Sequence, residues 1–167
     1  MDATSAATPL GILAEGTGES LPAMLDMFFG VRAGCLGETC AAALLIGGLY
    51  LMLRRVISPV IPLCYLGTAA LLSLAFGMDP TYQLLSGGLL LGAIFMATDY
   101  ATTPITKNGQ ILFGICCGVI TFLFRNIGGT PEGVSYAIIL SNLLVPLIEK
   151  ITVPRAFGVV KAKKEGK

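Results

Sequence analysis

Residues 110–124 read QILFGICCGVITFLF, and this run without a charged residue decides the fold class. Similar apolar runs lie at about 39–53, 56–76, 82–97 and 136–153. A helix that crosses the hydrocarbon core of a bilayer needs about 20 mostly apolar residues. The pattern therefore predicts an all-α integral membrane protein with about five transmembrane helices.

The composition supports the same class. Hydrophobic residues make up 54% of the 167 residues and charged residues only 13%, whereas a soluble domain typically carries about 25% charged residues. A soluble protein with a large core is the alternative, and the low charge disfavours it. Several of the apolar runs are shorter than a full crossing, and tilt, packing against partners or a broken helix could each explain the shortfall.

Several kinds of chemistry are disfavoured by the residue types. The chain has no histidine, which removes the commonest general base and the commonest metal ligand. Its five cysteines form no CxxC pair, and we expect them to act as small apolar residues rather than to bind a metal or a cluster. No basic stripe suggests nucleic-acid binding. We therefore predict no metal site and assign no catalytic acid or base.

The charges between the apolar runs predict an orientation. Basic residues follow the first run at Arg54 and Arg55, follow the third at Lys107, and recur in the tail at 156–167. If the runs alternate in direction, these positions share one side, which the positive-inside rule makes cytoplasmic. Arg125 falls on the other side and does not fit the rule.

Three regions are expected along the chain. They are an extracytoplasmic N-terminal region (1–34), a five-helix transmembrane domain (35–155) and a basic cytoplasmic tail (156–167). Residues 2–20 are polar, small and glycine-rich and lack the features of a signal peptide, so we expect later helices to direct membrane insertion. Residues 21–32 are too short to span a bilayer and predict an interfacial helix.

Two pairs of glycines have the spacing of close helix contacts. They are Gly88 with Gly92 and Gly114 with Gly118. Small residues four positions apart let helix backbones approach each other in a membrane. We expect these glycines to pack helices.

The N-terminal residues 2–10, DATSAATPL, form the first candidate site. Small residues allow another molecule to approach the backbone closely, and the hydroxyl of Thr8 lies between alanines and a proline. From the residues alone, an ordinary Ser/Thr turn remains the simpler interpretation.

The pattern Asp2-x-x-Ser5-x-Ala7-Thr8 resembles the flavinylation motif of the NqrB, NqrC, RnfD and RnfG proteins. In those proteins a dedicated transferase moves FMN from FAD onto the motif threonine as a phosphoester. The resemblance implies that Thr8 carries covalent FMN and that Asp2, Ser5 and Ala7 surround the attachment point. Many members have glycine where this chain has Ala6, which keeps the residue small.

Three further stretches are similar to RnfD in the same order. They are Gly37-Glu38-Thr39, the run FMATDYATTP at 95–104, and 126–137, NIGGTPEGVSYA. The chain is thus identified as a member of the NqrB/RnfD family, and it resembles the C-terminal half. The family fold this implies is a bundle of two inverted repeats of about five helices each, similar to urea transporters.

The resemblance also implies a function. An Rnf complex transfers electrons between ferredoxin and NAD⁺ and couples this to Na⁺ or H⁺ translocation, and this chain would be one of its membrane subunits. The implied partners are the other Rnf membrane subunits, an FMN-bearing RnfG-like subunit, a soluble iron–sulfur and flavin arm, a flavin transferase and membrane lipid. Riboflavin is a further cofactor that the family suggests. The implied location is a bacterial or archaeal cytoplasmic membrane, with the flavin outside and the C-terminus in the cytoplasm.

Two other functions compete with this one: a passive channel or solute transporter of the urea-transporter kind, and a membrane scaffold without cofactor. Both explain the apolar runs and the glycine pairs. Neither explains the residues around Thr8.

Two acidic residues near the expected outer face have both a structural and a functional interpretation. Gly37, Glu38 and Thr39 precede the first apolar run, where Glu38 would cap the helix or contact a cation or the flavin ring. Glu132 would pair with Arg125 or contact the FMN.

A third acidic residue, Asp99, stands at the end of the third run. Ionisable groups at membrane depth often mark ion pathways. We predict an ion pathway at Asp99, Thr102 and Thr103, and the alternative is a carboxylate that only accepts a hydrogen bond from one of these two threonines.

Overall fold

The structure, a computed structural model, describes residues 24–30, 40–86, 88–128 and 133–154. In these parts the chain is helical and contains no strand, which confirms the all-α prediction. The helices are α2 (Met24–Phe29), α3 (Ala41–Leu53), α4 (Val60–Ala75), α5 (Pro80–Leu85), α6 (Leu89–Leu91), the π-helical turn η1 (Gly92–Met96), α7 (Lys107–Asn126) and α8 (Val134–Thr152).

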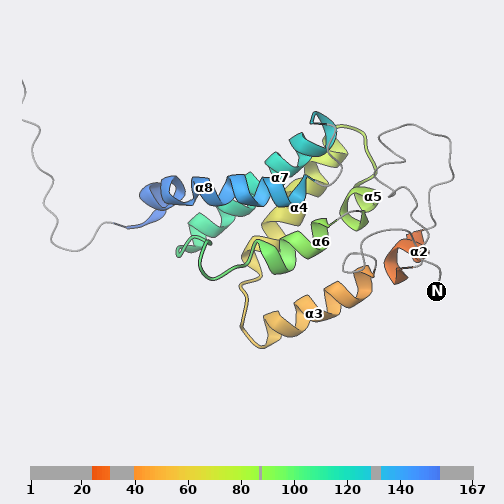
Figure 1. Cartoon of the computed structure of the whole chain (residues 1–167), viewed down its shortest axis with the longest axis horizontal. Coiled ribbons are helices and arrows are strands. Elements are labelled where there is room, and N and C mark those ends of the chain that lie inside the picture. The colour runs from red at the N-terminus through yellow and green to blue at the C-terminus, as the bar shows by residue number, and fades with distance from the viewer. Residues whose placement is uncertain (1–23, 31–39, 87, 129–132, 155–167) are drawn as a thin grey trace, which may run out of the picture.

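The helices form a bundle whose segments alternate in direction. Following the chain in Figure 1, α3, α4, the segment formed by α5, α6 and η1, α7 and α8 each run opposite to the segment before. By length and composition, α7 and α8 are long and apolar enough to cross a membrane, while α3 and α4 are shorter apolar helices. This is consistent with a membrane protein.

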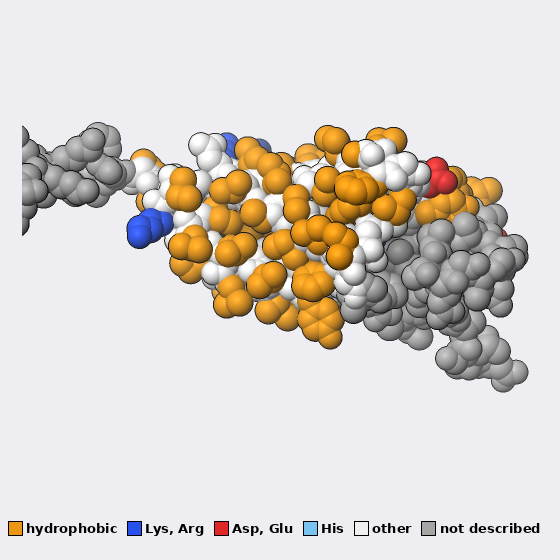
Figure 2. Space-filling model, turned by 90° about the horizontal axis from the view of Figure 1, so that it is seen from above, with side chains coloured by type: hydrophobic (Ala, Val, Ile, Leu, Met, Phe, Trp, Pro, Cys, Tyr) orange, Lys and Arg blue, Asp and Glu red, His pale blue; other side chains and the backbone are white. Residues whose placement is uncertain are grey.

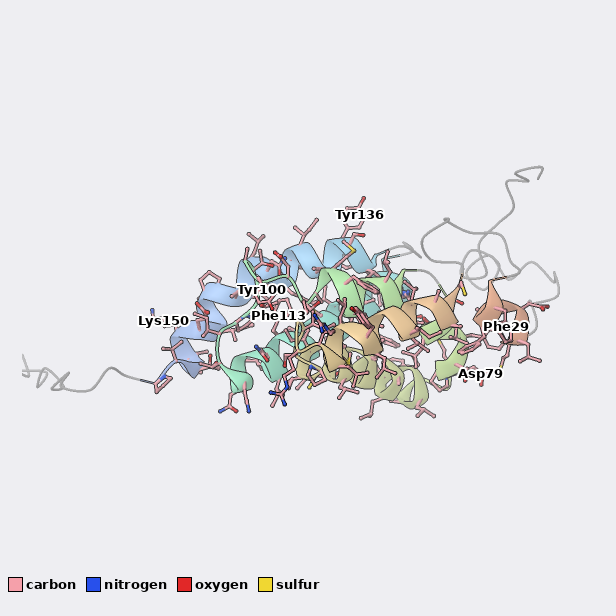
Figure 3. The ribbon with its side chains drawn as sticks, turned by 90° about the horizontal axis from the view of Figure 1, so that it is seen from below. Phe29, Asp79, Tyr100, Phe113, Tyr136 and Lys150 are labelled. Carbon is pink, nitrogen blue, oxygen red and sulfur yellow. The ribbon has the colours of Figure 1, made fainter. Side chains whose placement is uncertain are left out.

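Side chains on the outside of the bundle are largely apolar. On the face that Figure 2 shows, hydrophobic side chains cover most of the described part, with charged groups toward its ends. Leu49 on α3 and Leu143 on α8 are 58% and 70% exposed. Exposed leucines in such numbers fit a helix surface that faces lipid or other membrane subunits. In Figure 3, Lys150 lies near one end of the bundle and Asp79 near the other.

Helix α7 packs closely on α4 through the second glycine pair. A Cβ atom added to Gly114 would lie 2.8 Å from the Cβ of Cys64, and one added to Gly118 would lie 2.7 Å from the Cβ of Thr68. Real Cβ atoms do not approach so closely, so only glycine fits at either position. The prediction that this pair packs helices is confirmed.

In the first glycine pair, only one of the two glycines packs against another helix. Gly92, in η1, lies against Val134 and Ile138 of α8 and leaves no room for a side chain. Gly88 instead precedes α6 at a break in the helical segment. Helix packing is confirmed for Gly92.

The third apolar run is a broken helix. Read as continuous, it predicts one helix over about 82–97, but α5 ends at Leu85 and α6 begins at Leu89. Ser86 between them has extended backbone angles, with φ −91° and ψ 143°. Serine followed by two glycines is a poor helix former, because glycine loses most conformational freedom in a helix and serine competes for backbone hydrogen bonds. Among the explanations for the short runs, the broken helix applies here.

Candidate functional site

The loop between η1 and α7 brings together the predicted ion-pathway residues. The hydroxyl of Thr102 donates to Asp99 Oδ2 at 3.3 Å, and the hydroxyl of Thr103 donates to the backbone carbonyl of Asp99 at 2.8 Å. Asp99 is exposed at the end of the bundle rather than buried within it. The expected hydrogen bonding is therefore present, and the role of these residues in ion movement stays a prediction.

A groove of about 330 Å³ lies beside this loop. Its polar lining comes from Ser58, Thr98, Tyr100, Thr103 and Gln110. The hydroxyl of Tyr100 donates to the backbone carbonyl of Val56, which ties the loop to the turn between α3 and α4. Only one of the three predicted residues, Thr103, belongs to the lining.

Sequence reasoning did not single out Tyr100 or Gln110. Tyr100 stands inside the run FMATDYATTP, so the resemblance already marked its position without giving it a role. Gln110 has no such signal, because it only reaches the groove when the first turn of α7 folds back on the loop. There its side-chain amide donates to the carbonyl of Pro104 at 3.3 Å.

The C-terminal end of α8 contacts the loop between η1 and α7. Glu149 Oε1 accepts a hydrogen bond from the backbone N–H of Ile105 at 3.3 Å. The carboxylate thus holds the loop to α8, while the neighbouring Lys150 is exposed.

A second polar cluster lies at the opposite end of the bundle, around Arg125. This side chain is only 8% exposed, although it belongs to the last turn of α7. Its guanidinium donates from Nη1 to the carbonyl of Gln83 at 2.7 Å and from Nη2 to the carbonyl of Ser86 at 3.0 Å. Arg125 did not fit the orientation rule because it was counted as a loop charge, whereas it is buried and binds the end of α5.

A buried polar contact continues from Arg125 toward the middle of the bundle. Thr121 lies one turn earlier on α7, and its hydroxyl forms a hydrogen bond with the hydroxyl of Tyr65 on α4. Tyr65 is fully buried and Thr121 is 1% exposed. Arg125 and Thr121, one turn apart on α7, therefore both face the inside of the bundle.

The candidate flavin residues lie outside the described residues. They are Asp2, Ser5, Ala7, Thr8, Gly37, Glu38, Thr39 and Glu132. Along the sequence, α2 and Cys40 adjoin the undescribed residues 1–23 and 31–39, and the Cys40 thiol donates to the carbonyl of Phe28 at 3.9 Å. Met27 of α2 is fully buried. Phe29 and Asp79 lie at the same end of the molecule in Figure 3, opposite to Lys150.

Comparison with known proteins gives consistent matches over most of the chain. The D subunit of the Na⁺-translocating ferredoxin:NAD⁺ oxidoreductase complex of Acetobacterium woodii is 51% identical over 99% of this chain and 53% of the relative. The corresponding D subunit of the proton-translocating ferredoxin:NAD⁺ oxidoreductase complex of Clostridium ljungdahlii is 43% identical over 95% of this chain and 52% of the relative. That of the ion-translocating oxidoreductase complex of Stutzerimonas stutzeri is 46% identical over 81% of this chain and 40% of the relative.

The chain spans about half the length of the curated relatives that it matches. The model of the NQR2, RnfD, RnfE family matches residues 1–158. The resemblance inferred from the four sequence motifs is thereby confirmed, and the chain belongs to the NQR2, RnfD, RnfE family.

Proposed function

We propose that this chain is a membrane subunit of an ion-translocating ferredoxin:NAD⁺ oxidoreductase and that Thr8 carries FMN as a phosphoester. The observation that carries the proposal is the pattern Asp2-x-x-Ser5-x-Ala7-Thr8 in a chain of this family. The names of relatives that cover nearly the whole chain support the oxidoreductase assignment. The chain corresponds to about half of such a subunit, and we infer that it is the C-terminal half.

The attachment reaction needs one hydroxyl and a flavin dinucleotide. The Thr8 oxygen forms a bond to the phosphorus next to the riboflavin, the pyrophosphate bond of FAD breaks, and AMP leaves with the hydroxyl proton taken up by the medium. The tether keeps the flavin at a high local concentration beside its redox partners. The bound flavin supplies the electron transfer, and the chain's residues hold and orient it.

The arrangement of the helices supports five crossings. Five segments alternate in direction, so the end of α2 and the end of α8 lie on opposite sides of the bundle (Figure 1). We propose that the flavin side is extracytoplasmic and the α8 end is cytoplasmic, in a bacterial or archaeal cytoplasmic membrane. The apolar outer surface would then contact lipid, the remaining half of the subunit, the other Rnf membrane subunits and the RnfG-like subunit. Riboflavin would bind with the help of that other half.

Ion movement is proposed to involve the loop at Asp99. Its carboxylate is exposed at the cytoplasmic end, beside the polar groove that Thr103 lines. An exposed carboxylate at a groove attracts cations to its mouth. The names of the relatives include both a sodium-translocating and a proton-translocating complex, so we propose Na⁺ or H⁺ as the coupled ion.

Flavin fluorescence on a denaturing gel tests the proposal. The chain is produced with the other subunits of its complex and with the flavin transferase, and the gel is viewed under ultraviolet light. The wild-type band should fluoresce, and Thr8→Ala should be dark. Thr4→Ala in the same stretch is the matched control and should keep its fluorescence.

A wild-type band that carries no flavin, with no FMN mass on the Thr8 peptide, would refute the attachment. That result would favour the channel or scaffold functions instead.

A further inference from the structure

Helix α8 carries an unpaired polar side chain near its middle. Three buried side-chain oxygens have no hydrogen-bond partner among the described residues, and they belong to Ser86, Ser141 and Asn142. Ser86 and Ser141 are 0% exposed, so both lie inside the bundle. Asn142 is half-buried, so it lies at the boundary between the inside of the bundle and its outer surface. Its Oδ1 atom therefore needs a donor that the described residues do not supply.

The backbone of the same residue also lacks its usual donor. In an α-helix the carbonyl of position 142 accepts a hydrogen bond from the N–H of position 146. Position 146 is a proline inside α8, and proline has no N–H to donate. The hydrocarbon core of a bilayer has no water that could replace missing donors, and each unsatisfied polar group there is costly. A side of α8 that met only lipid at Asn142 would be disfavoured.

Exposed residues at the spacing of a helix-packing seam lie on either side of Asn142. Together they form one side of α8, which we call the α8 seam: Ser135, Ile139, Asn142 and Pro146. Intervals of four, three and four residues keep these positions on one side of a helix. Ile139 is 60% exposed, and Ser135 and Pro146 are also exposed. The α8 seam is therefore a surface along which a second helix can lie.

Other exposed parts of the bundle do not require a partner in this way. Leu49 on α3 and Leu71 on α4 are 58% and 69% exposed. Lipid tails are as apolar as leucine, so these side chains are stable against lipid. An asparagine in a membrane helix instead forms hydrogen bonds across helices. Among the described elements α8 packs mainly on α7 and η1, and neither provides a donor to Asn142 Oδ1.

The length of the chain indicates where the donor comes from. The chain spans 53% of one relative and 52% of another, so about half of such a subunit lies outside it. A helix linked covalently to this chain is present at a higher local concentration than a helix of a separate protein. The rest of the subunit is therefore the favoured source of a helix that covers the α8 seam.

We propose that the α8 seam binds a transmembrane helix from the other half of the subunit, and that a hydroxyl or amide group on that helix donates to Asn142. The proposal rests on the proposed assignment of this chain as one half of a membrane subunit. It does not depend on the flavin.

Photo-cross-linking in the full-length subunit, within its complex, tests which molecule covers the α8 seam. Photoreactive benzoylphenylalanine replaces Ile139, membranes are irradiated, and cross-linked peptides are identified by mass spectrometry. The peptide from α8 should be joined to a peptide from the part of the subunit outside this chain. The same replacement at Leu71, an exposed position on α4, is the matched control and should give no such product.

A second measurement tests the hydrogen bond by the sign of its effect. Asn142→Leu removes the amide and keeps a side chain of similar size. If the amide is paired across helices, this variant of the full-length subunit should unfold at a lower fraction of denaturing detergent than the wild type. If the amide meets lipid, the variant should be as stable as the wild type or more stable, because an unpaired polar group has been removed from hydrocarbon. Asn142→Gln keeps an amide and should lie closer to the wild type than Asn142→Leu.

The outcomes separate the possible occupants of the α8 seam. Cross-links from position 139 only to lipid, to a different subunit or to a second copy of the subunit would overturn the proposal, and so would equal capture of the other half from position 71. An Asn142→Leu subunit that is at least as stable as the wild type would also overturn it. If Asn142→Leu does not assemble, the cross-links of the protein with Asn142 intact decide alone.

The intact mass of the subunit from its native host distinguishes failure of this proposal from failure of the proposed function. A mass equal to that of this chain alone would refute the assignment as one half, and the docking proposal with it. A full-length mass together with cross-links elsewhere would refute the docking proposal alone.

Discussion

Replacing Gly118 with alanine measures how closely α7 packs on α4. The added Cβ would lie 2.7 Å from Thr68 Cβ, 3.0 Å from Thr68 Cγ2 and 3.1 Å from the carbonyl oxygen of Tyr65. Two of these atoms belong to the backbone or are fixed directly to it, so no side-chain rotation can relieve the contact. The helices must separate by several tenths of an ångström, and overpacking of this kind costs about 1–3 kcal/mol.

The same chain offers a matched control at Gly67, in the middle of α4. An alanine Cβ at Gly67 would meet nothing within 4 Å. Alanine at an unconstrained helix position is more stable than glycine by about 0.5–1 kcal/mol. The two variants add the same methyl group, yet their free energies of unfolding should differ by roughly 1.5–4 kcal/mol.

The assay is an unfolding titration of the complex with a denaturing detergent, monitored by a spectroscopic signal of helix content. Gly118→Ala should unfold at a lower detergent fraction than the wild type, and Gly67→Ala at the same or a higher fraction. If Gly118→Ala proved as stable as Gly67→Ala, the conclusion that α7 packs too closely on α4 for a side chain at position 118 would be wrong.

Two further changes test the polar groups. Tyr65→Phe keeps the ring but removes the hydroxyl that bonds to Thr121. Because the buried Thr121 hydroxyl is then unpaired, the free energy of unfolding should fall by about 1–2 kcal/mol, measured by the same titration. An unchanged midpoint would mean that Thr121 finds another partner at no cost. Asp99→Asn keeps an oxygen that can accept from Thr102 but removes the charge, so we expect slower coupled ion uptake in vesicles with unchanged flavin loading. Equal ion uptake by Asp99→Asn and the wild type would exclude Asp99 from the ion pathway.

The helices themselves could be predicted because they depend on local patterns. The uncharged run 110–124 lies wholly within α7, and the run 136–153 nearly coincides with α8. The glycine spacing at 114 and 118 predicted close packing, since residues four apart share a helix face. In each case the cause lies within a few residues of the effect.

The broken third segment could not be placed in the same way. Hydropathy is high on both sides of Ser86, so an apolar run alone reads as one helix. What stabilises the break is Arg125, which binds the carbonyl of Ser86 from 39 residues further along the chain. Sequence alone does not show that a basic residue in the last turn of one helix will bind the end of another.

In the candidate site, too, local contacts could be predicted and long-range contacts could not. The bonds of Thr102 and Thr103 to Asp99 span three and four residues, and they were among the expected alternatives. The groove beside them was not expected, because Val56 and Tyr100 meet only in the folded bundle. The residues near Thr8 were found by resemblance alone, and they lie outside the described residues.

The burial of Arg125 also strengthens the argument for orientation. Once this residue is removed from the set of loop charges, the basic residues in the described parts of the chain all lie at one end of the bundle. They are Arg54, Arg55, Lys107 and Lys150, where α3 and α8 end and α4 and α7 begin. The positive-inside rule concerns charges in loops, and a buried guanidinium is not a loop charge. The basic loop residues in the described parts of the chain are therefore consistent with one orientation. In a variant whose five native cysteines are replaced by alanine, a single cysteine is introduced at Lys107 or at Asp79 and labelled with a membrane-impermeant reagent in whole cells. Only the cysteine at position 79 should be modified. Modification at position 107 instead would show that the orientation is the opposite one.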